Sequence, residues 1–313
     1  MEAFTAKDVA ELRQKTGAGM MECKNALKES SGNIEKAIEL LRQKGLIAAL
    51  KKSEKAVLEG IVASKISSDK KSGVMLELNT QTDFVAKNDS FLDLSKTILD
   101  ITLNNKPKNI DGLLNIKFNG TPVTDLISSK IATIGENIQL RRFELFELGK
   151  ENGIIGTYIH PVGNKIGVLV KLITNSDIAN YRTDLEDIAK NIAMHVAACQ
   201  PQAEYIDKTK VPNEIIENEK RIELGKEDLA KKPKEIAEKI VQGRLDKLLS
   251  QKCLLDQPYI KDQSVTIEKF INDKGKQLSL DIRVDKFVRY NVGESLEKSL
   301  DNEQKMTVGI SGQ

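Results

Sequence analysis

The sequence contains no tryptophan, and aromatic residues make up only 4% of its 313 residues. Surfaces that bind single-stranded nucleic acid stack bases on aromatic rings, so this composition disfavours them. Basic residues number 48 against 46 acidic ones, which leaves a formal net charge of +2. Because a protein that binds a polyanion normally carries a basic excess, we predict no direct contact with nucleic acid.

Histidine and cysteine are also scarce. The two histidines are His160 and His195, and the three cysteines, Cys23, Cys199 and Cys253, lie far apart along the chain. These residues lack the spacing of a transition-metal site, and an odd number of separated cysteines argues against a disulfide framework. We therefore predict no metal, no cofactor and a reducing compartment, with each cysteine acting as a small buried hydrophobe.

Long apolar runs and catalytic motifs are missing as well. No run approaches the roughly 20 residues of a membrane span, and the first residues do not resemble a secretory or transit peptide. The glycines of "GAGMM" follow no strand and precede no Gly-Lys-Ser/Thr, and no Gly-x-Ser-x-Gly occurs. We predict a cytoplasmic protein without membrane contact that is not an enzyme.

What the sequence does contain begins with helical periodicity. Residues 5 to 45 are predicted to form three short helices, in which Thr5 and Asp8 resemble a capping box and Asn33 caps the third helix. We expect Gly45 to end that helix. The predicted docking module spans residues 1–47, and a lysine-rich linker follows over 48–56.

Two later segments, 60–80 and 156–174, look like copies of each other. Each has a glycine, a first strand, a polar turn and then Gly-Val opening a second alternating strand, which is typical of a β-hairpin. Helical periodicity follows each copy. We predict an α+β fold with duplicated core subdomains, 57–142 and 143–209, and expect the stretch 131–148 to form a short helix and then a strand that opens the second copy.

Charged helical sequence covers 210–250, where Pro233 should end one helix and begin the next. The pattern predicts an antiparallel helical hairpin with a narrow coiled-coil seam. The predicted seam residues are Ile215, Ile216, Ile222, Leu224, Ile236, Ile240, Val241 and Leu245. Residues 251–313 should complete the second subdomain and add a C-terminal module with short strands, such as 278–290, and a polar tail.

The sequence leaves some residues with two interpretations. A loop phenylalanine such as Phe84 in "NTQTDFVAKND" normally packs on its own core, and an aspartate beside it normally caps the next helix. The alternative is that Phe84 binds another protein. Met20 and Met21 pose the same choice between packing and partner contact. His195, near a helix end, is either a partner contact or a surface histidine with its polar atoms satisfied, while His160 in a hairpin turn is more simply structural.

Five separated motifs, in one order along nearly the whole chain, resemble bacterial elongation factor Ts. They are "ELRQKTGAGMMECKNAL", "NTQTDFVAKN", "KIATIGENIQLRR", "IAMHVAACQP" and "KPKEIAEKIVQGRL". That family comprises guanine-nucleotide exchange factors for the translational GTPase elongation factor Tu, and it implies a ubiquitin-associated-like (UBA-like) N-terminal module. The insert 104–130 and the polar tail depart from the family pattern. A non-catalytic scaffold is the competing interpretation.

The resemblance also implies roles for single residues. The turn of Thr82, Asp83, Phe84 and Val85 would dislocate Mg²⁺ from the nucleotide site of elongation factor Tu, with Asp83 and Phe84 entering between helices of its G domain.

Two other contact regions are implied by the same resemblance. Arg13, Met20 and Met21 would contact another helix of the G domain, and His195 would face the partner away from the nucleotide. Binding would occur to GDP-bound and nucleotide-free elongation factor Tu, either one-to-one or as a dimer of heterodimers.

Overall fold

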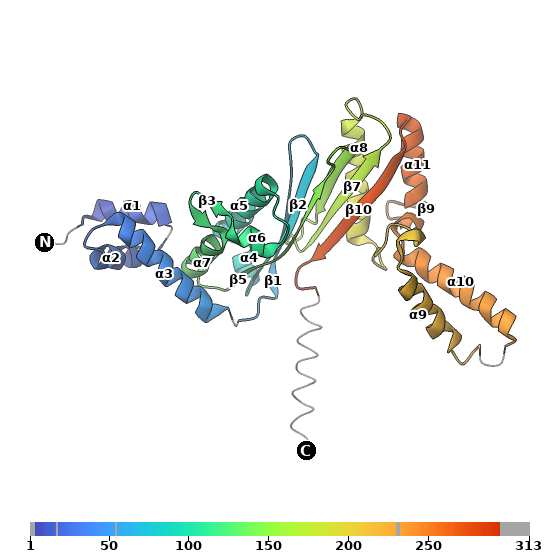
Figure 1. Ribbon diagram of the computed structural model, residues 1–313, viewed down its shortest axis with the longest axis horizontal. Coiled ribbons are helices and arrows are strands. Elements are labelled where there is room, and N and C mark those ends of the chain that lie inside the picture. Colours follow the sequence, from blue (N-terminus) through green and yellow to red (C-terminus); the bar gives the residue numbers. More distant parts are fainter. Residues whose placement is uncertain (1–3, 17, 54, 230–231, 295–313) are drawn as a thin grey trace, which may run out of the picture.

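The computed structural model describes residues 4–16, 18–53, 55–229 and 232–294 as an elongated molecule (Figure 1). A three-helix module lies at one end, two sheets with their helices form the middle, and a helical hairpin projects at the other end. The fold is therefore a mixture of helix and antiparallel sheet, as the sequence predicts. The predicted polar tail after residue 294 lies outside the described residues.

The helices and strands have the following bounds. The helices are α1 Ala6–Thr16, α2 Met20–Glu29, α3 Ile34–Lys52, α4 Asp83–Ala86, α5 Asp89–Asn105, α6 Ile110–Asn115, α7 Val123–Ile134, α8 Arg182–Ala198, α9 Asn213–Leu224, α10 Lys234–Lys252 and α11 Ile267–Leu278, with short 3₁₀ helices at Lys208–Lys210 and Leu254–Asp256. The strands are β1 Glu59–Ile66, β2 Ser72–Thr80, β3 Lys117–Phe118, β4 Thr121–Pro122, β5 Ile138–Glu147, β6 Asn152–Ile159, β7 Ile166–Thr174, β8 Pro258–Tyr259, β9 Asp262–Thr266 and β10 Ile282–Asn291.

The N-terminal module has the caps that its sequence predicts. The backbone N–H of Thr5 donates to Asp8 Oδ2 at 2.7 Å, while the N–H of Asp8 donates to Thr5 Oγ1 at 3.3 Å. The side chain of Asn33 accepts from the N–H of Lys36 at 2.9 Å, which caps α3. A small core holds the three helices together, and its fully buried members are Leu12, Cys23, Ala26, Leu27 and Ala37.

The prediction that Gly45 ends the third helix is wrong, because α3 continues to Lys52. Gly45 is buried against α7, where a Cβ added to it would lie 3.7 Å from the carbonyl oxygen of Ser128. Packing against α7 offsets the roughly 1 kcal/mol that a glycine costs in a helix. Arg42 on α3 also pairs with Asp125 on α7. The first part of the predicted linker 48–56 is therefore helix, and α3 attaches the module to the core.

Two three-stranded antiparallel sheets form the middle of the described chain, in the orders β1-β2-β5 and β6-β7-β10. Both predicted hairpins are confirmed as β1-β2 and β6-β7. The prediction that the strand in 131–148 opens the second copy is wrong, because β5 pairs with β2 over its whole length. The buried backbone N–H and C=O groups on both edges of β2 need hydrogen-bond partners, and β1 and β5 supply them. Strand β10 occupies the equivalent position beside β7.

Each central strand is buried on both faces. Val74, Leu76 and Leu78 of β2 face the helices of their own repeat, among them α5 and α7. Met75, between them in sequence, faces the other way and packs with Leu169 of β7 in a core shared by the two sheets. Alternate residues of a strand point to opposite faces, so the layers run helix, sheet, sheet, helix.

The two sheets approach each other through equivalent glycines. A Cβ on Gly73 of β2 would lie 2.6 Å from Ile155 Cγ2, and a Cβ on Gly167 of β7 would lie 2.4 Å from Val62 Cγ1. Both distances are shorter than real Cβ contacts, so each glycine makes room for a side chain of the other repeat.

Backbone hydrogen bonds repeat this reciprocity. The N–H of Val62 donates to the carbonyl of Asn164 at 2.7 Å, and the N–H of Ile155 donates to the carbonyl of Lys70 at 3.0 Å. Asn164 and Lys70 each occupy the hairpin turn of their own repeat with a positive φ, of 52° and 62°. The two repeats are therefore packed about an approximate twofold axis.

The helical hairpin differs from its prediction in which residues form the seam. Pro233 precedes α10 as predicted, but α9 already ends at Leu224, where Gly225 follows. The following loop brings Leu229 into the seam with Ala237 and Val241. As a result, three residues predicted for the seam are substantially exposed: Ile222, Leu224 and Ile236.

The C-terminal segment contains a helix that the sequence analysis missed. Thr266 caps α11, and Ile267, Phe270 and Ile271 lie at helical spacing against the core of the second repeat. After α11, strand β10 confirms the predicted strand in 278–290 and completes the second sheet. The three cysteines are free and buried, as predicted.

Candidate functional site

The turn after β2 carries the most exposed large apolar side chain of the described core. Phe84 lies in the single-turn helix α4 and is 81% exposed. Thr82 caps this helix, since its side chain accepts from the N–H of Val85 at 3.4 Å. Val85 packs partly against the core of the first repeat, and Ala86 is buried there. The backbone is thus anchored on both sides of Phe84 while its ring faces solvent.

Glu136 holds this turn from a neighbouring element and was not singled out by the sequence analysis. Its Oε2 accepts from the hydroxyl of Thr80 at 3.0 Å and from the N–H of Thr82 at 3.1 Å. Its Oε1 accepts from the hydroxyl of Thr82 at 2.8 Å. These residues are 54 or 56 positions apart in sequence, so no local pattern signals the contact.

Asp83 does not cap either neighbouring helix, because Thr82 caps α4 and Asn88 caps α5. Its carboxylate instead accepts a hydrogen bond from Lys87 Nζ at 2.7 Å. This bond lowers the pKa of Asp83 below its ordinary value, so the group is anionic at neutral pH. The turn therefore presents an exposed ion pair between Asp83 and Lys87 beside an exposed aromatic ring.

The second repeat supplies an internal comparison for Phe84. There, Ile178 follows an aspartate in the turn after β7, and the N–H of Tyr181 donates to the Ile178 carbonyl at 2.9 Å. The N–H of Lys87 donates to the Phe84 carbonyl in the same way, at 3.3 Å. Ile178, however, is only 8% exposed and belongs to its own repeat's core. Exposure of Phe84 is therefore particular to the first repeat and does not follow from the topology.

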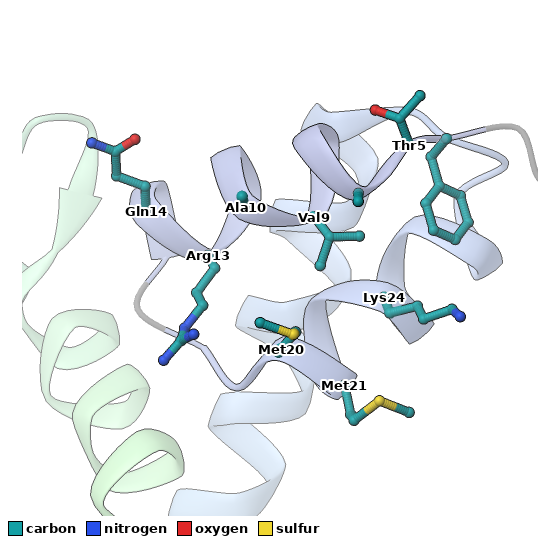
Figure 2. Close-up of a pocket in the computed structure, with 10 residues that line it drawn as sticks. Thr5, Val9, Ala10, Arg13, Gln14, Met20, Met21 and Lys24 are labelled. Carbon is teal, nitrogen blue, oxygen red and sulfur yellow. The ribbon is translucent and has the colours of Figure 1, made fainter.

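A second apolar surface lies on the N-terminal module (Figure 2). Met20 and Met21, at the start of α2, are 59% and 66% exposed, so neither belongs to the module's core. Their neighbours around a shallow pocket, drawn in Figure 2, are Phe4, Thr5, Ala6, Val9, Ala10, Arg13, Gln14 and Lys24. We call this surface the methionine patch. Packing within the module does not explain the two methionines.

Arg13 adds a positive charge to the methionine patch. It comes from α1 and extends toward the start of α2 in Figure 2. Its side chain is exposed, and within the described residues no carboxylate pairs with it. The patch thus combines flexible apolar side chains with a guanidinium group, a composition common at protein–protein contacts.

His195 is not the surface residue that the sequence analysis expected. It lies at the end of α8 but is 1% exposed, because the segment after α10 covers it. Its Nδ1 accepts from the N–H of Ile260 at 3.2 Å, and its Nε2 lies 2.9 Å from Gln257 Oε1. Since Nδ1 accepts, the ring proton belongs on Nε2 and is donated to Gln257.

The environment of His195 keeps the ring neutral. Burial lowers its pKa below the ordinary value of 6.5, and the bond to Gln257 only partly opposes this. Gln257 in turn donates to the carbonyls of Pro201 and Gln251. His195 therefore joins α8 to the segments around residues 201, 251 and 260, and lies apart from both the Phe84 turn and the methionine patch.

Within the described residues, no group of three or more His, Cys, Asp or Glu side chains is placed to hold a metal ion. Among those same residues, no helix is both long and apolar enough to cross a bilayer.

Comparison with known proteins gives consistent matches. The family model described as elongation factor TS matches residues 81–294. Proteins named elongation factor Ts from Nostoc sp. and Nostoc punctiforme are each 44% identical, over 305 and 302 residues, covering 96% and 95% of both chains. One from Syntrophotalea carbinolica is 42% identical over 304 residues, 96% of both chains.

Proposed function

The chain belongs to the elongation factor Ts family of translation elongation factors, and from this premise we propose that it releases GDP from elongation factor Tu. It would bind the GDP-bound partner, lower its affinity for nucleotide, remain bound in the nucleotide-free state and leave when GTP binds. The observation that carries this proposal is the 81% exposure of Phe84 on an anchored turn.

Burial of Phe84 in a partner supplies free energy of the size that exchange needs. Complete burial of a phenylalanine side chain is worth about 1.5 to 3 kcal/mol. A hundredfold loss of nucleotide affinity corresponds to about 2.7 kcal/mol of coupling. By linkage, if the chain lowers the affinity of elongation factor Tu for GDP by some factor, GDP lowers the affinity of elongation factor Tu for the chain by the same factor. Nucleotide and exchange factor therefore displace each other.

The Mg²⁺ ion of the partner is the proposed target of the Phe84 turn. Mg²⁺ requires nearly ideal octahedral geometry, so small displacements of the groups that position it weaken its binding. Insertion of Phe84, with the anionic Asp83 beside it and Thr82 and Val85 fixing the backbone, would displace such groups. This chain then needs no covalent or acid–base chemistry of its own.

The remaining predicted contacts supply affinity in this proposal. Met20, Met21 and Arg13 would bind a separate helix of the partner's G domain, with the three-helix module acting as a UBA-like docking module. The α9–α10 hairpin would be a coiled-coil arm. His195 would contribute through the loop at 257–260, which it holds, since its own ring nitrogens are both engaged.

The test is release of a fluorescent GDP analogue from preloaded elongation factor Tu, followed by stopped flow. We expect the release rate to rise with the concentration of the full chain and to saturate. A scaffold protein would bind elongation factor Tu in calorimetry and leave the release rate unchanged, which would refute the proposal.

A further inference from the structure

We propose that Glu136 is a positioning residue that fixes the Phe84 turn for insertion into the partner, an inference that rests on the proposed function. The observation is the set of hydrogen bonds that its carboxylate accepts. Within the described residues, each comes from Thr80 or Thr82, the two residues at which β2 passes into α4.

The contacts leave the turn little freedom. Oε2 binds a hydroxyl at the end of β2 and the backbone N–H at the cap of α4, while Oε1 binds the hydroxyl of the same cap residue. That hydroxyl also accepts from the N–H of Val85, next to Phe84. The carboxylate is therefore connected to both sides of the exposed ring through Thr82.

The corner that carries Glu136 is itself fixed. Gly135 ends α7 with φ 91°, and its carbonyl accepts from Lys52 Nζ at 2.6 Å. The side chain of Asn137 donates to the carbonyl of Lys55 at 2.9 Å. Glu136 thus projects from a corner held by the end of α3 and the segment after it, and the same corner connects the N-terminal module to the Phe84 turn.

Glu136 has no competing assignment as an ion-pair partner. Among the described residues, no lysine or arginine pairs with Glu136, whereas Glu147 at the end of β5 pairs with Lys106. A carboxylate accepts hydrogen bonds without donating, and it matches the hydroxyl and N–H donors gathered here. The chemistry of the residue therefore points to the turn and to nothing else in the described chain.

Loss of the Glu136 hydrogen bonds should lower the rate of GDP release more than the affinity for elongation factor Tu. Phe84 would still be present and exposed, and the methionine patch would still bind. Because a misplacement of about 1 Å can cost up to about a hundredfold in a positioned reaction step, we expect Glu136→Ala to lower the saturating GDP-release rate about fivefold to tenfold. The concentration for half-saturation should change by less than about twofold, since most of the contact surface is unaltered.

Conservative variants separate positioning from general structure. Glu136→Gln keeps one oxygen that can accept from Thr80 and Thr82, and its amide can donate to the Thr82 hydroxyl, so it should restore most of the rate. Glu136→Asp keeps the charge but withdraws the carboxylate by one methylene, so it should fall between Gln and Ala. The matched control is Glu147→Ala, which removes an exposed carboxylate and should release GDP at the wild-type rate.

The deciding experiment is a double-mutant cycle in stopped-flow GDP release, with wild type, Glu136→Ala, Phe84→Ala and the double variant. If Glu136 acts through Phe84, adding Glu136→Ala to Phe84→Ala causes no further loss. Multiplying losses, or a wild-type rate in Glu136→Ala, would overturn the inference. If Glu136→Ala does not fold, Glu136→Asp takes its place in the same cycle.

A measurement without the partner distinguishes failure of this inference from failure of the proposed function. Amide hydrogen exchange at Thr82 and Val85 should be at least about fivefold faster in Glu136→Ala than in wild type, because a turn that has lost these hydrogen bonds opens more often. Unchanged exchange would refute the hold itself. A wild-type chain that does not accelerate GDP release would instead refute the proposed function and leave the amide result standing.

Discussion

Substitution of Phe84 by alanine separates the two interpretations that the sequence leaves open. Truncation of a buried phenylalanine costs about 3 to 5 kcal/mol of folding free energy, through lost burial and the cavity left behind. Phe84 is 81% exposed in the free chain. Since only a fifth of that side chain is covered, we expect Phe84→Ala to lower the free energy of unfolding by less than about 0.5 kcal/mol, as for other surface substitutions.

The effect on exchange should be much larger. If the ring becomes buried in elongation factor Tu, its loss removes about 1.5 to 3 kcal/mol of interaction with the partner. When most of this free energy is realised in the transition state for release, the saturating GDP-release rate falls about tenfold to a hundredfold. The assay is stopped-flow release of fluorescent GDP, with thermal unfolding measured on the same preparation.

Two control variants sharpen this result. Phe91 is fully buried in the same repeat, and Ile178 occupies the equivalent turn of the second repeat with 8% exposure. Phe91→Ala and Ile178→Ala should each destabilise the chain by about 2 kcal/mol or more, and Ile178→Ala should leave release at saturation unchanged while the protein is folded. Marked destabilisation by Phe84→Ala, with exchange intact, would show that the ring serves its own core.

Three further predictions concern other parts of the chain. Replacing both Met20 and Met21 by alanine should weaken binding to elongation factor Tu about tenfold in calorimetry, roughly 1.4 kcal/mol. The melting temperature should not change, because both side chains are exposed in the free chain. An unaltered affinity would exclude the methionine patch as a contact. Replacing residues 222–242 by a short Gly-Ser linker should lower the melting temperature by less than about 4 °C. The base of the hairpin keeps its own apolar cluster, so little of the core is lost. A drop of more than about 10 °C would contradict this prediction. The pKa of His195 is lowered in the folded chain, so its stabilising contribution is present above its unfolded pKa of about 6.5 and is lost as pH falls toward the folded value. The difference in free energy of unfolding between wild type and His195→Gln should therefore shrink from pH 7.5 to pH 5.5. A difference that stays constant would mean that folding does not lower the pKa of this ring.

Local patterns predicted the parts of the fold that depend on local structure. The two β-hairpins, the helices after them and the caps at Thr5 and Asn33 follow from residue spacing and turn chemistry. Three-dimensional partners decided the rest. Gly45 continues a helix because α7 packs beside it, and β5 joins the first sheet because β2 has a free edge there. The residues next to each of these positions in the sequence do not predict either contact.

The candidate site shows the same division. The motif around Phe84 was recognisable in the sequence, but its exposure depends on where the turn points once the repeat has folded. His195 was placed on the surface because its partner, Gln257, lies 62 residues away. Glu136 was passed over for the same reason, as a carboxylate beside a helix-ending glycine shows no sign of the two threonines that it binds.

The reciprocal packing of the two repeats has a consequence for how this chain unfolds. Each repeat lacks part of its own interior, because Gly73 and Gly167 receive side chains from the other copy and each hairpin turn bonds to the other's first strand. Neither half should therefore persist as an independent folding unit, and the two should melt in a single cooperative transition, as the subunits of an obligate homodimer do. The two repeats lie in one chain, so their sequences need not be identical, unlike those of the two subunits of a homodimer. That freedom allows one copy to display Phe84 while the other keeps Ile178 inside.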